Sequence, residues 1–216
     1  MPWVASLTPE RQREAVRLYE SGLSAQQTAD QLGTSLDAVF YALRKLKVPR
    51  RSIHESNRIR FERSPLSYSL KAELTDKEER LKIAAVMLYW AEGYKIGATI
   101  DFANSDPEMA ALFMQFLVRI CGVNRARVRC HLYCYEGQDV DSLTAFWSKL
   151  LDVPQSQFIK PYINRKLQPG PRGPRMIHGL IHICYCDKRL LTQILNWIAE
   201  YSQECVGGGA VNRTGL

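Results

Sequence analysis

The sequence predicts an α+β protein in which a small helical domain precedes a larger domain of helices and strands. The first 54 residues show only helical periodicity. Residues 76–201 combine amphipathic helical segments with segments in which apolar and polar residues alternate, as in a sheet with one solvated face. Residues 55–75, between these regions, lack a clear period. We therefore expect two domains joined by a linker, with a flexible tail over residues 202–216.

The composition is that of a globular protein, with a charge distribution that favours a polyanion partner. Six cysteines without a signal peptide predict reduced thiols and a cytoplasmic location, and no apolar run approaches the roughly 18 residues of a membrane span. Residues 44–63 contain eight Lys or Arg against two Glu, and residues 160–175 contain five against no acid. These segments favour DNA and a nucleoid association. The alternative is ordinary solvated surface charge.

Three short helices are predicted within residues 1–54. Thr8 and Pro9 have the residue types of an N-cap and a first helical position. Ser24, with Gln27 three residues later, has the pattern of a capping box that starts the second helix. Gly33 permits the positive φ of a tight turn, and Ser35 caps the third helix.

The spacing Thr28-Ala29-x-x-Leu32-Gly33-x-Ser35-x-x-x-Val39-x-x-x-Leu43 closely resembles the helix-turn-helix of resolvases and invertases. In such motifs the outer face of the last helix lies in the DNA major groove. The alternative is a helical bundle for protein contacts, which the adjacent basic segment disfavours. The resemblance places these residues on the DNA-facing side: Thr34, Ser35, Asp37, Ala38, Tyr41 and Arg44.

The segment after the third helix is predicted to form an extended arm. Pro49 disfavours helix in the residue before it. Lys47, Arg50 and Arg51 are then expected to contact DNA, with the two arginines entering a minor groove.

Residues 76–201 are predicted to form an antiparallel sheet that helices cover on one face. The polar face of one strand contains Arg127, Arg129, His131 and Tyr133, and a later strand directs His182 outward. Residues 98–117 and 179–198 match at an offset of 81, with strand, acidic cap and amphipathic helix in each. The predicted elements are helices over 76–93, 106–122, 140–151 and the last segment to about 201, and strands over 98–104, 125–136, 157–164 and 179–186.

The segment "AAVMLYWAEG", residues 84–93, followed by a strand and "NSDPEMAALFMQFL", resembles the LAGLIDADG homing endonuclease family. The resemblance covers roughly residues 78–201 and is closest to single-motif, partly degenerate members. It implies that two such helices pack side by side, that each presents an acid to a metal ion, and that the sheets form a saddle over the major groove. The implied saddle and neighbouring basic loop contain Arg127, Arg129, His131, Tyr133, Lys160, Arg172, Arg175 and His182.

Glu92 corresponds to the metal-binding and catalytic acid of that motif. Because there is one copy, two acids require a homodimer, with Mg²⁺ activating water for phosphodiester hydrolysis. Met87 and Trp90 depart from the small residues that the packed helices prefer. These departures fit a fold retained for DNA binding at least as well as a nuclease. The alternative for Glu92 is a solvated acid or one paired with Lys95.

The leading hypothesis is sequence-specific binding of double-stranded DNA by a homodimer, in a regulatory or mobile-element role and without a cofactor. The first alternative is a Mg²⁺-dependent homing-type endonuclease that uses Glu92 from each subunit. The second is a protein-interaction module without DNA binding.

The cysteine pairs 130/134 and 184/186 invite a zinc interpretation. If the first pair lies in a strand, its members are about 13 Å apart at the usual rise, which is too far for one tetrahedral ion. Convergence of four cysteines from two strands is the alternative to a role as buried small hydrophobes.

Overall fold

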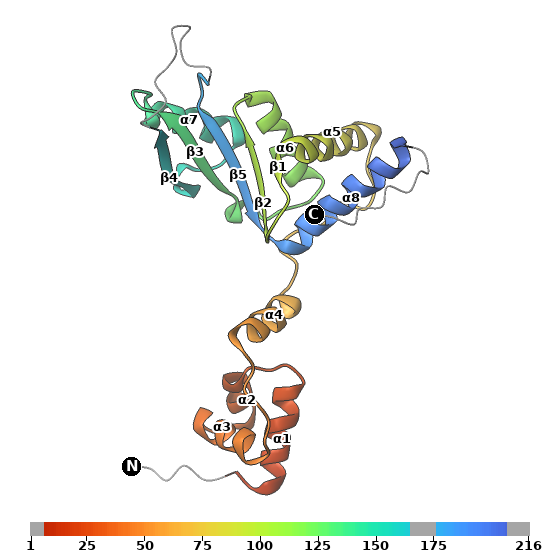
Figure 1. Cartoon of the computed structure of the whole chain (residues 1–216), viewed down its shortest axis with the longest axis vertical. Helices are drawn as coiled ribbons and strands as arrows, with labels where there is room; N and C mark the ends of the chain where they lie inside the picture. The colour runs from red at the N-terminus through yellow and green to blue at the C-terminus, as the bar shows by residue number, and fades with distance from the viewer. Residues whose placement is uncertain (1–6, 165–175, 207–216) are drawn as a thin grey trace. The chain divides into compact units, whose positions relative to one another are not determined.

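The computed structural model describes residues 7–164 and 176–206 (Figure 1). The chain divides into two compact units, residues 1–65 and 66–216, which we call the N-terminal unit and the second unit. The division lies inside the predicted linker. The described residues of the N-terminal unit form helices, and those of the second unit form helices and strands, so the chain as a whole is of the expected α+β class.

The N-terminal unit begins with three short helices whose starts are set by the predicted caps. Ser24 and Gln27 form a reciprocal capping box, and the Ser35 hydroxyl accepts from the Ala38 amide at 3.2 Å. Gly33 has φ 59° and ψ 42°, so the tight turn uses the left-handed conformation that glycine adopts readily. The helices are α1 (Pro9–Glu20), α2 (Ala25–Leu32) and α3 (Leu36–Lys45).

Small and branched residues form the core where these three helices meet. Ala15, Ala29, Val39 and Leu43 are all buried. Ala29 has no exposed surface, because α1 and α3 both pack against α2. A larger side chain there would have to displace one of those helices.

The first half of the predicted linker is a fourth helix, α4 (Ile53–Arg63), contrary to the expectation of an irregular segment. Ser52 caps it by accepting from the Glu55 amide at 3.1 Å. The helix has no buried residue, and the Arg63 guanidinium joins it to the first three helices by donating to the Ser21 carbonyl. Apolar periodicity does not reveal such a helix, because its stability depends on caps and polar contacts.

The second unit contains a five-stranded sheet in the order β1-β2-β5-β3-β4 (Figure 1). Its elements, with two 3₁₀ turns, are α5 (Asp76–Glu92), β1 (Gly93–Tyr94), β2 (Thr99–Asn104), α6 (Pro107–Arg119), η1 (Arg125–Arg127), β3 (Arg129–Tyr135), α7 (Val140–Leu151), η2 (Gln155–Gln157), β4 (Phe158–Asn164), β5 (Leu180–Cys186) and α8 (Lys188–Val206).

The sheet is mixed, which corrects the prediction of an antiparallel sheet. Strands β3 and β4 are parallel, whereas the other three pairs are antiparallel. The reason is the connection through α7, since parallel neighbours require a crossover and a helix usually supplies it.

The last helix is longer than predicted. Helix α8 continues to Val206, so residues 202–206 of the predicted tail are helical.

The two segments that match at an offset of 81 residues are neighbours in the sheet. Strands β2 and β5 pair antiparallel, with Phe102 directly opposite Ile183. These two residues also correspond in the sequence match, so a local two-fold relation passes between them. Asp106 and Asp187 then occupy equivalent places, and each accepts from backbone amides at the start of the following helix.

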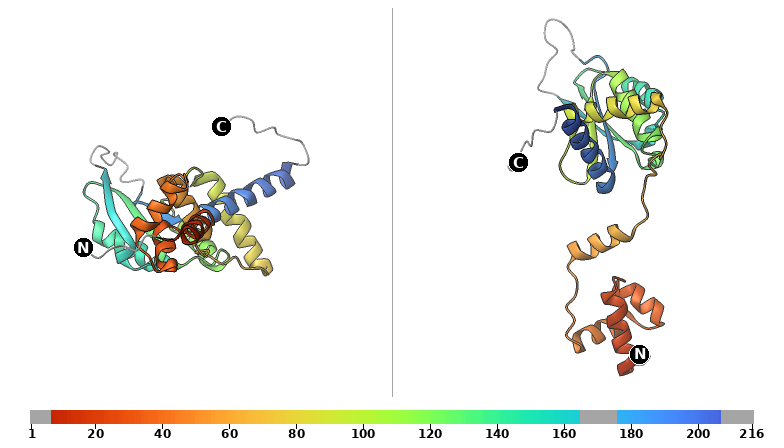
Figure 2. Two further views of the ribbon diagram at one scale, coloured as in Figure 1. Left: turned by 90° about the horizontal axis from the view of Figure 1, so that it is seen from below. Right: turned by 90° about the vertical axis from the view of Figure 1, so that its right-hand side faces the viewer.

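One face of the sheet is covered by helices, as predicted. Residues on this face of β2, β3 and β5 are buried and join side chains of α5, α6, α7 and α8 in one core. Helices α5 and α8 lie side by side (Figures 1 and 2). Phe113 of α6 is central, with ring centroids 4.4 Å from Phe102 and 5.5 Å from Tyr89.

The second half of the predicted linker is bound to the second unit by backbone hydrogen bonds. The Ser69 amide donates to the Cys121 carbonyl at 3.1 Å, and the Lys71 amide donates to the Ile120 carbonyl at 2.9 Å. Gly122, with φ 56°, lies so close that an added Cβ would be 2.2 Å from the Ser69 oxygen.

We expect Gly122→Ala to destabilise the second unit by about 2–4 kcal/mol, because a strained φ and a backbone clash act together. Gly137→Ala is the matched control, since Gly137 has φ 89° but open space around it. Thermal unfolding followed by calorimetry measures both. Equal losses in the two variants would show that the approach of Ser69 has no energetic role.

Candidate nucleic-acid interface

The exposed side of α3 presents a smaller set of side chains than the sequence predicted. Asp37, Tyr41 and Arg44 are exposed, and Thr34 is half-buried. Ser35 is also half-buried, and its hydroxyl caps the helix. Ala38 is 8% exposed and packs in the core, so its predicted place on the outer face is corrected. It lies one turn before the buried Ala42 and therefore shares that residue's inward face.

The arginines of the predicted arm lie against the N-terminal unit instead of extending from it. The Arg50 guanidinium carbon is 3.6 Å from the centroid of the Phe40 ring, and that of Arg51 is 3.9 Å from the centroid of the Tyr19 ring. Arg51 also donates to the Tyr19 and Leu23 carbonyls. Lys47 is exposed and has φ 57°. Cation–π contacts, together with carbonyl acceptors in the last turn of α1 and in the turn that follows it, thus hold a segment that the sequence predicted to be extended.

The face of the sheet opposite the helices contains a compact group of rings. His131 and His182 are directly opposite each other on β3 and β5, with ring centroids 6.1 Å apart. The Tyr133 ring lies 4.5 Å from both imidazoles and 5.0 Å from the Tyr162 ring of β4. We call these four residues the ring cluster. Tyr162 is 52% exposed, so the cluster presents aromatic surface to solvent.

Asp101 of β2 completes this surface with a carboxylate. Its Oδ1 atom lies 2.9 Å from Nδ1 of His182, which orients that ring. The sequence analysis did not select Asp101 as a functional residue. The internal sequence match could have indicated this residue, because Asp101 and His182 correspond to each other at the offset of 81. The antiparallel pairing of β2 and β5 then brings the two side chains together.

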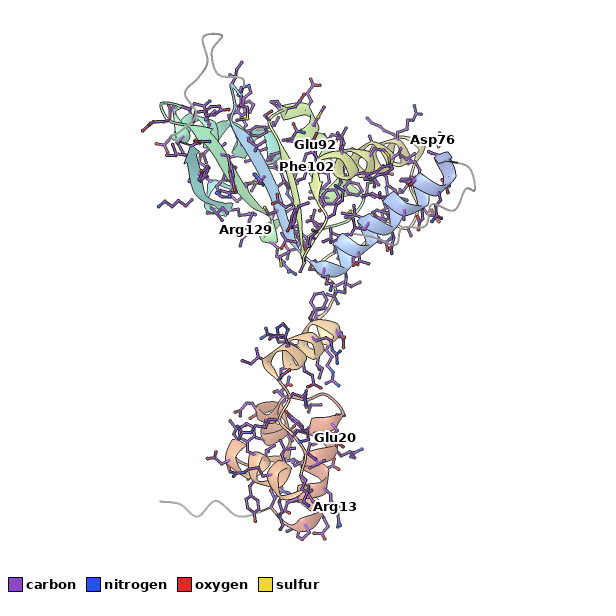
Figure 3. All side chains as sticks on the ribbon, viewed as in Figure 1. Arg13, Glu20, Asp76, Glu92, Phe102 and Arg129 are labelled. Atoms are coloured by element: carbon purple, nitrogen blue, oxygen red, sulfur yellow. The ribbon has the colours of Figure 1, made fainter. Side chains whose placement is uncertain are left out.

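The arginines near the sheet lie at its end and donate to backbone carbonyls. Arg129 donates from Nη1 to the Ala126 carbonyl at 2.8 Å, and Figure 3 labels it on β3. Arg127 is in η1, before the strand in which it was predicted, and donates to the Cys186 carbonyl at 2.9 Å. Each guanidinium has five N–H donors, so both retain donors for an anion.

Lys160 is exposed on the edge strand β4, beside the register shift between His131 and Tyr133. The predicted DNA contacts Arg172 and Arg175 lie outside the described residues.

Two features lower the pKa of His131 from its usual value. The larger is burial, which disfavours the charged imidazole, and the second is the nearby His182. A hydrogen bond with the Lys160 backbone and the charge of Asp101 act in the opposite direction. The pKa of His131 is thus lower in the folded chain than in the unfolded chain. This difference favours the folded state at pH values above the ordinary pKa of histidine. The contribution is lost as the pH falls through the lower pKa that His131 has in the folded chain.

Substitutions around His131 are expected to move its pKa in opposite directions. His182→Gln removes the neighbour whose charge lowers the pKa of His131 and should raise that pKa, whereas Asp101→Asn removes an attracting charge and should lower it further. NMR titration of the His131 imidazole measures both. A shift of the same sign in the two variants would contradict this electrostatic account.

Glu92 is exposed at the end of α5, where Figure 3 labels it. Lys95 does not pair with it, because the ammonium group donates to the Gly93 carbonyl at 2.9 Å. Within the described residues, the Glu92 carboxylate has no hydrogen bond or ion pair. Of the two forms of the structural alternative, the described residues therefore show the solvent-exposed acid and not the pair with Lys95.

The described residues of one chain do not fit a magnesium or zinc site. They contain no group of three or more His, Cys, Asp or Glu side chains arranged to hold a metal ion. A single exposed carboxylate supplies one ligand, whereas Mg²⁺ prefers six oxygens in an octahedron. Cys130 and Cys134 are buried in the core, and burial raises the pKa of the Cys130 thiol to about 12. Cys184 lies on the opposite face of the sheet, so the cysteines do not converge.

Comparisons of the chain with protein families, curated proteins and solved structures find no match. Among the helices that the structure describes, none combines the length and the apolar character needed to span a membrane.

Proposed function

We propose that this protein binds double-stranded DNA sequence-specifically, in a regulatory or mobile-element role. The N-terminal unit acts as a helix-turn-helix whose helix α3 enters the major groove, and the second unit acts as a LAGLIDADG-like saddle. The observation that supports the proposal most strongly is the exposure of one side of α3. The other side of this helix packs against α1 and α2, so Asp37, Tyr41 and Arg44 are held at the surface. Residues 44–63, which begin at the end of this helix, have a net charge of +6.

These side chains are suited to reading bases and holding phosphates. Arginine recognises guanine edges with two hydrogen bonds, and an acid accepts from cytosine. Lys45 lies 5.8 Å from the Tyr41 ring centroid, so positive charge flanks the aromatic residue. The many cations nearby supply the salt-dependent attraction to phosphates on which non-specific binding rests.

The sheet supports a second contact with DNA. The ring cluster offers aromatic faces, and Arg127, Arg129 and Lys160 provide cations at the sheet's end and edge. Exposed apolar side chains on and after α5 support a homodimer, since Trp90 is 38% and Ile96 71% exposed. Two copies are required for the symmetric site that the LAGLIDADG resemblance implies.

DNA cleavage is not part of the proposal, because among the described residues of the chain no group of three or more His, Cys, Asp or Glu side chains is arranged to hold a metal ion with Glu92. The same preparation nevertheless tests the nuclease hypothesis. Supercoiled plasmid that is cut with Mg²⁺ by the native chain, but not by Glu92→Gln, would establish it.

The proposal is tested by fluorescence anisotropy of labelled duplex DNA with the full chain. We expect binding in low salt that weakens steeply as salt rises, and selection from a random-sequence duplex pool should enrich one motif. Arg44→Glu should weaken binding, whereas Arg13→Glu on α1, whose native side chain is 70% exposed, is the matched control.

Three outcomes would decide against the proposal or its parts. No retention of mixed-sequence duplex in low salt would overturn DNA binding, and association with a protein at all salt concentrations would then favour an interaction module. Equal effects of the two reversals would remove α3 from the interface. Sedimentation of a monomer on DNA would overturn the homodimer.

A further inference from the structure

A pocket of about 780 Å³ lies within the N-terminal unit, between the turn from α1 to α2 and helix α4. Four arginines line it: Arg50, Arg51, Arg60 and Arg63. We call it the arginine pocket. Among the described residues that line it there is no Asp or Glu, so they give the pocket positive charge without a carboxylate to neutralise it. The pocket is distinct from the exposed side of α3, which contains the residues assigned to the major groove.

Two of the arginines hold the pocket together. Arg51 donates to the Tyr19 and Leu23 carbonyls, and Arg63 donates to the Ser21 carbonyl. The Tyr19 carbonyl lies in the last turn of α1, and the Ser21 and Leu23 carbonyls lie in the turn between α1 and α2. Arg63 also fills the space above Gly22, where an added Cβ would be 2.5 Å from its Nη2 atom.

The other two arginines have donors to offer a ligand. The Arg50 guanidinium carbon lies 3.6 Å from the centroid of the Phe40 ring, and a contact with a ring face uses none of the N–H donors of the guanidinium. Arg60 donates one N–H to Asn57 Oδ1 at 3.2 Å, on its own helix. A guanidinium has five donors, so each of these residues can engage an anion with a pair of N–H groups.

The start of α2 adds backbone donors to the same wall. In the capping box the Ser24 amide donates to the Gln27 side chain, and the Gln27 amide donates to the Ser24 hydroxyl. The amides of Ala25 and Gln26 occupy the first two helical positions, for which the helix contains no acceptor, and both residues line the pocket. The positive end of the helix dipole reinforces the arginines.

We propose that the arginine pocket binds a phosphate group. Guanidinium pairs and helix-start amides together match the several oxygens of a phosphate, and the volume admits a phosphate with its attached sugar. The group comes either from a DNA backbone beside the site of α3 or from a free phosphorylated molecule. Only the first source rests on the proposed function.

Binding of inorganic pyrophosphate and of duplex DNA by the full chain tests the proposal. Arg50→Gln and Arg60→Gln remove the ligand-facing charges, whereas Arg51 and Arg63 are left intact because they support the fold. Arg58→Gln is the matched control, since Arg58 is on the same helix, faces Glu62 at 3.8 Å and does not line the pocket. Calorimetry measures pyrophosphate binding, anisotropy measures DNA binding, and circular dichroism verifies that each variant is folded.

The two sources give different results. With a free phosphate as ligand, pyrophosphate binds the native chain and Arg58→Gln, and binds each pocket variant about tenfold or more weakly. With DNA as the source, pyrophosphate does not bind, and each pocket substitution lowers the slope of log affinity against log salt by about 1, unlike Arg58→Gln.

The proposal is overturned if the pocket variants and Arg58→Gln behave alike in both assays. Arg60→Gln keeps the test decisive if Arg50→Gln fails to fold, because Arg60 is exposed on α4. Pyrophosphate binding by a chain that retains no DNA would support the pocket while refuting the proposed function.

Discussion

Replacing Phe113 by alanine is expected to lower the free energy of unfolding of the second unit by about 3–5 kcal/mol. Phe113 has no exposed surface, and its ring lies among those of Tyr89, Phe102 and Phe116. Three elements, α5, β2 and α6, therefore lose packing together. Burial of an aromatic side chain and its ring contacts both contribute to the loss.

Calorimetry of the full chain measures this effect, with Gln115→Ala as the matched control. Gln115 is exposed on the same helix, and surface substitutions usually change stability by less than about 0.5 kcal/mol. The transition of the N-terminal unit should keep its midpoint, because the two units have separate cores. A loss below about 1 kcal/mol for Phe113→Ala would contradict the central position of this ring.

Leu43→Ala is expected to unfold the N-terminal unit and, with it, to abolish sequence-specific DNA binding. Leu43 is 1% exposed and packs with Tyr19, Ala29 and Val39 where the three helices meet. A buried leucine truncated to alanine costs about 2–5 kcal/mol, and a core this small supplies little more than that.

Tyr41→Ala separates folding from contact, because Tyr41 is 47% exposed on the other side of α3. It should leave the unfolding midpoint nearly unchanged while weakening DNA binding. Circular dichroism and anisotropy on the same samples measure the two properties. Wild-type DNA affinity in a Leu43→Ala chain whose N-terminal unit is unfolded would remove that unit from the binding function.

The helix caps, one tight turn and the buried faces of the strands could be predicted from the sequence alone. The hydroxyl caps, the capping box at Ser24 and the left-handed turn at Gly33 depend on residues within three or four positions of one another. The alternation along β3 and β5 predicted which face is buried, because successive side chains of a strand point to opposite faces. The α+β class followed from these elements, and the structure confirms it.

The candidate site was only partly predictable. His131, Tyr133 and His182 were placed correctly on one face, but Asp101 and Tyr162 join them through pairings between strands that are far apart in the sequence. The arginine pocket was missed for a similar reason. Arg60 and Arg63 lie on a helix without an apolar stripe, so periodicity does not detect it.

What the sequence by itself determined is therefore local: where each helix starts, which strand face is buried and where positive charge gathers. Only the tertiary structure decided that β4 runs parallel to β3 and that Arg50 and Arg51 lie on aromatic rings. It also decided that the Lys95 ammonium group donates to the Gly93 carbonyl and does not pair with Glu92. The physical reason is that caps and alternation involve near neighbours in the chain. Strand order and the partner of a long cationic side chain depend instead on which distant groups folding brings within reach.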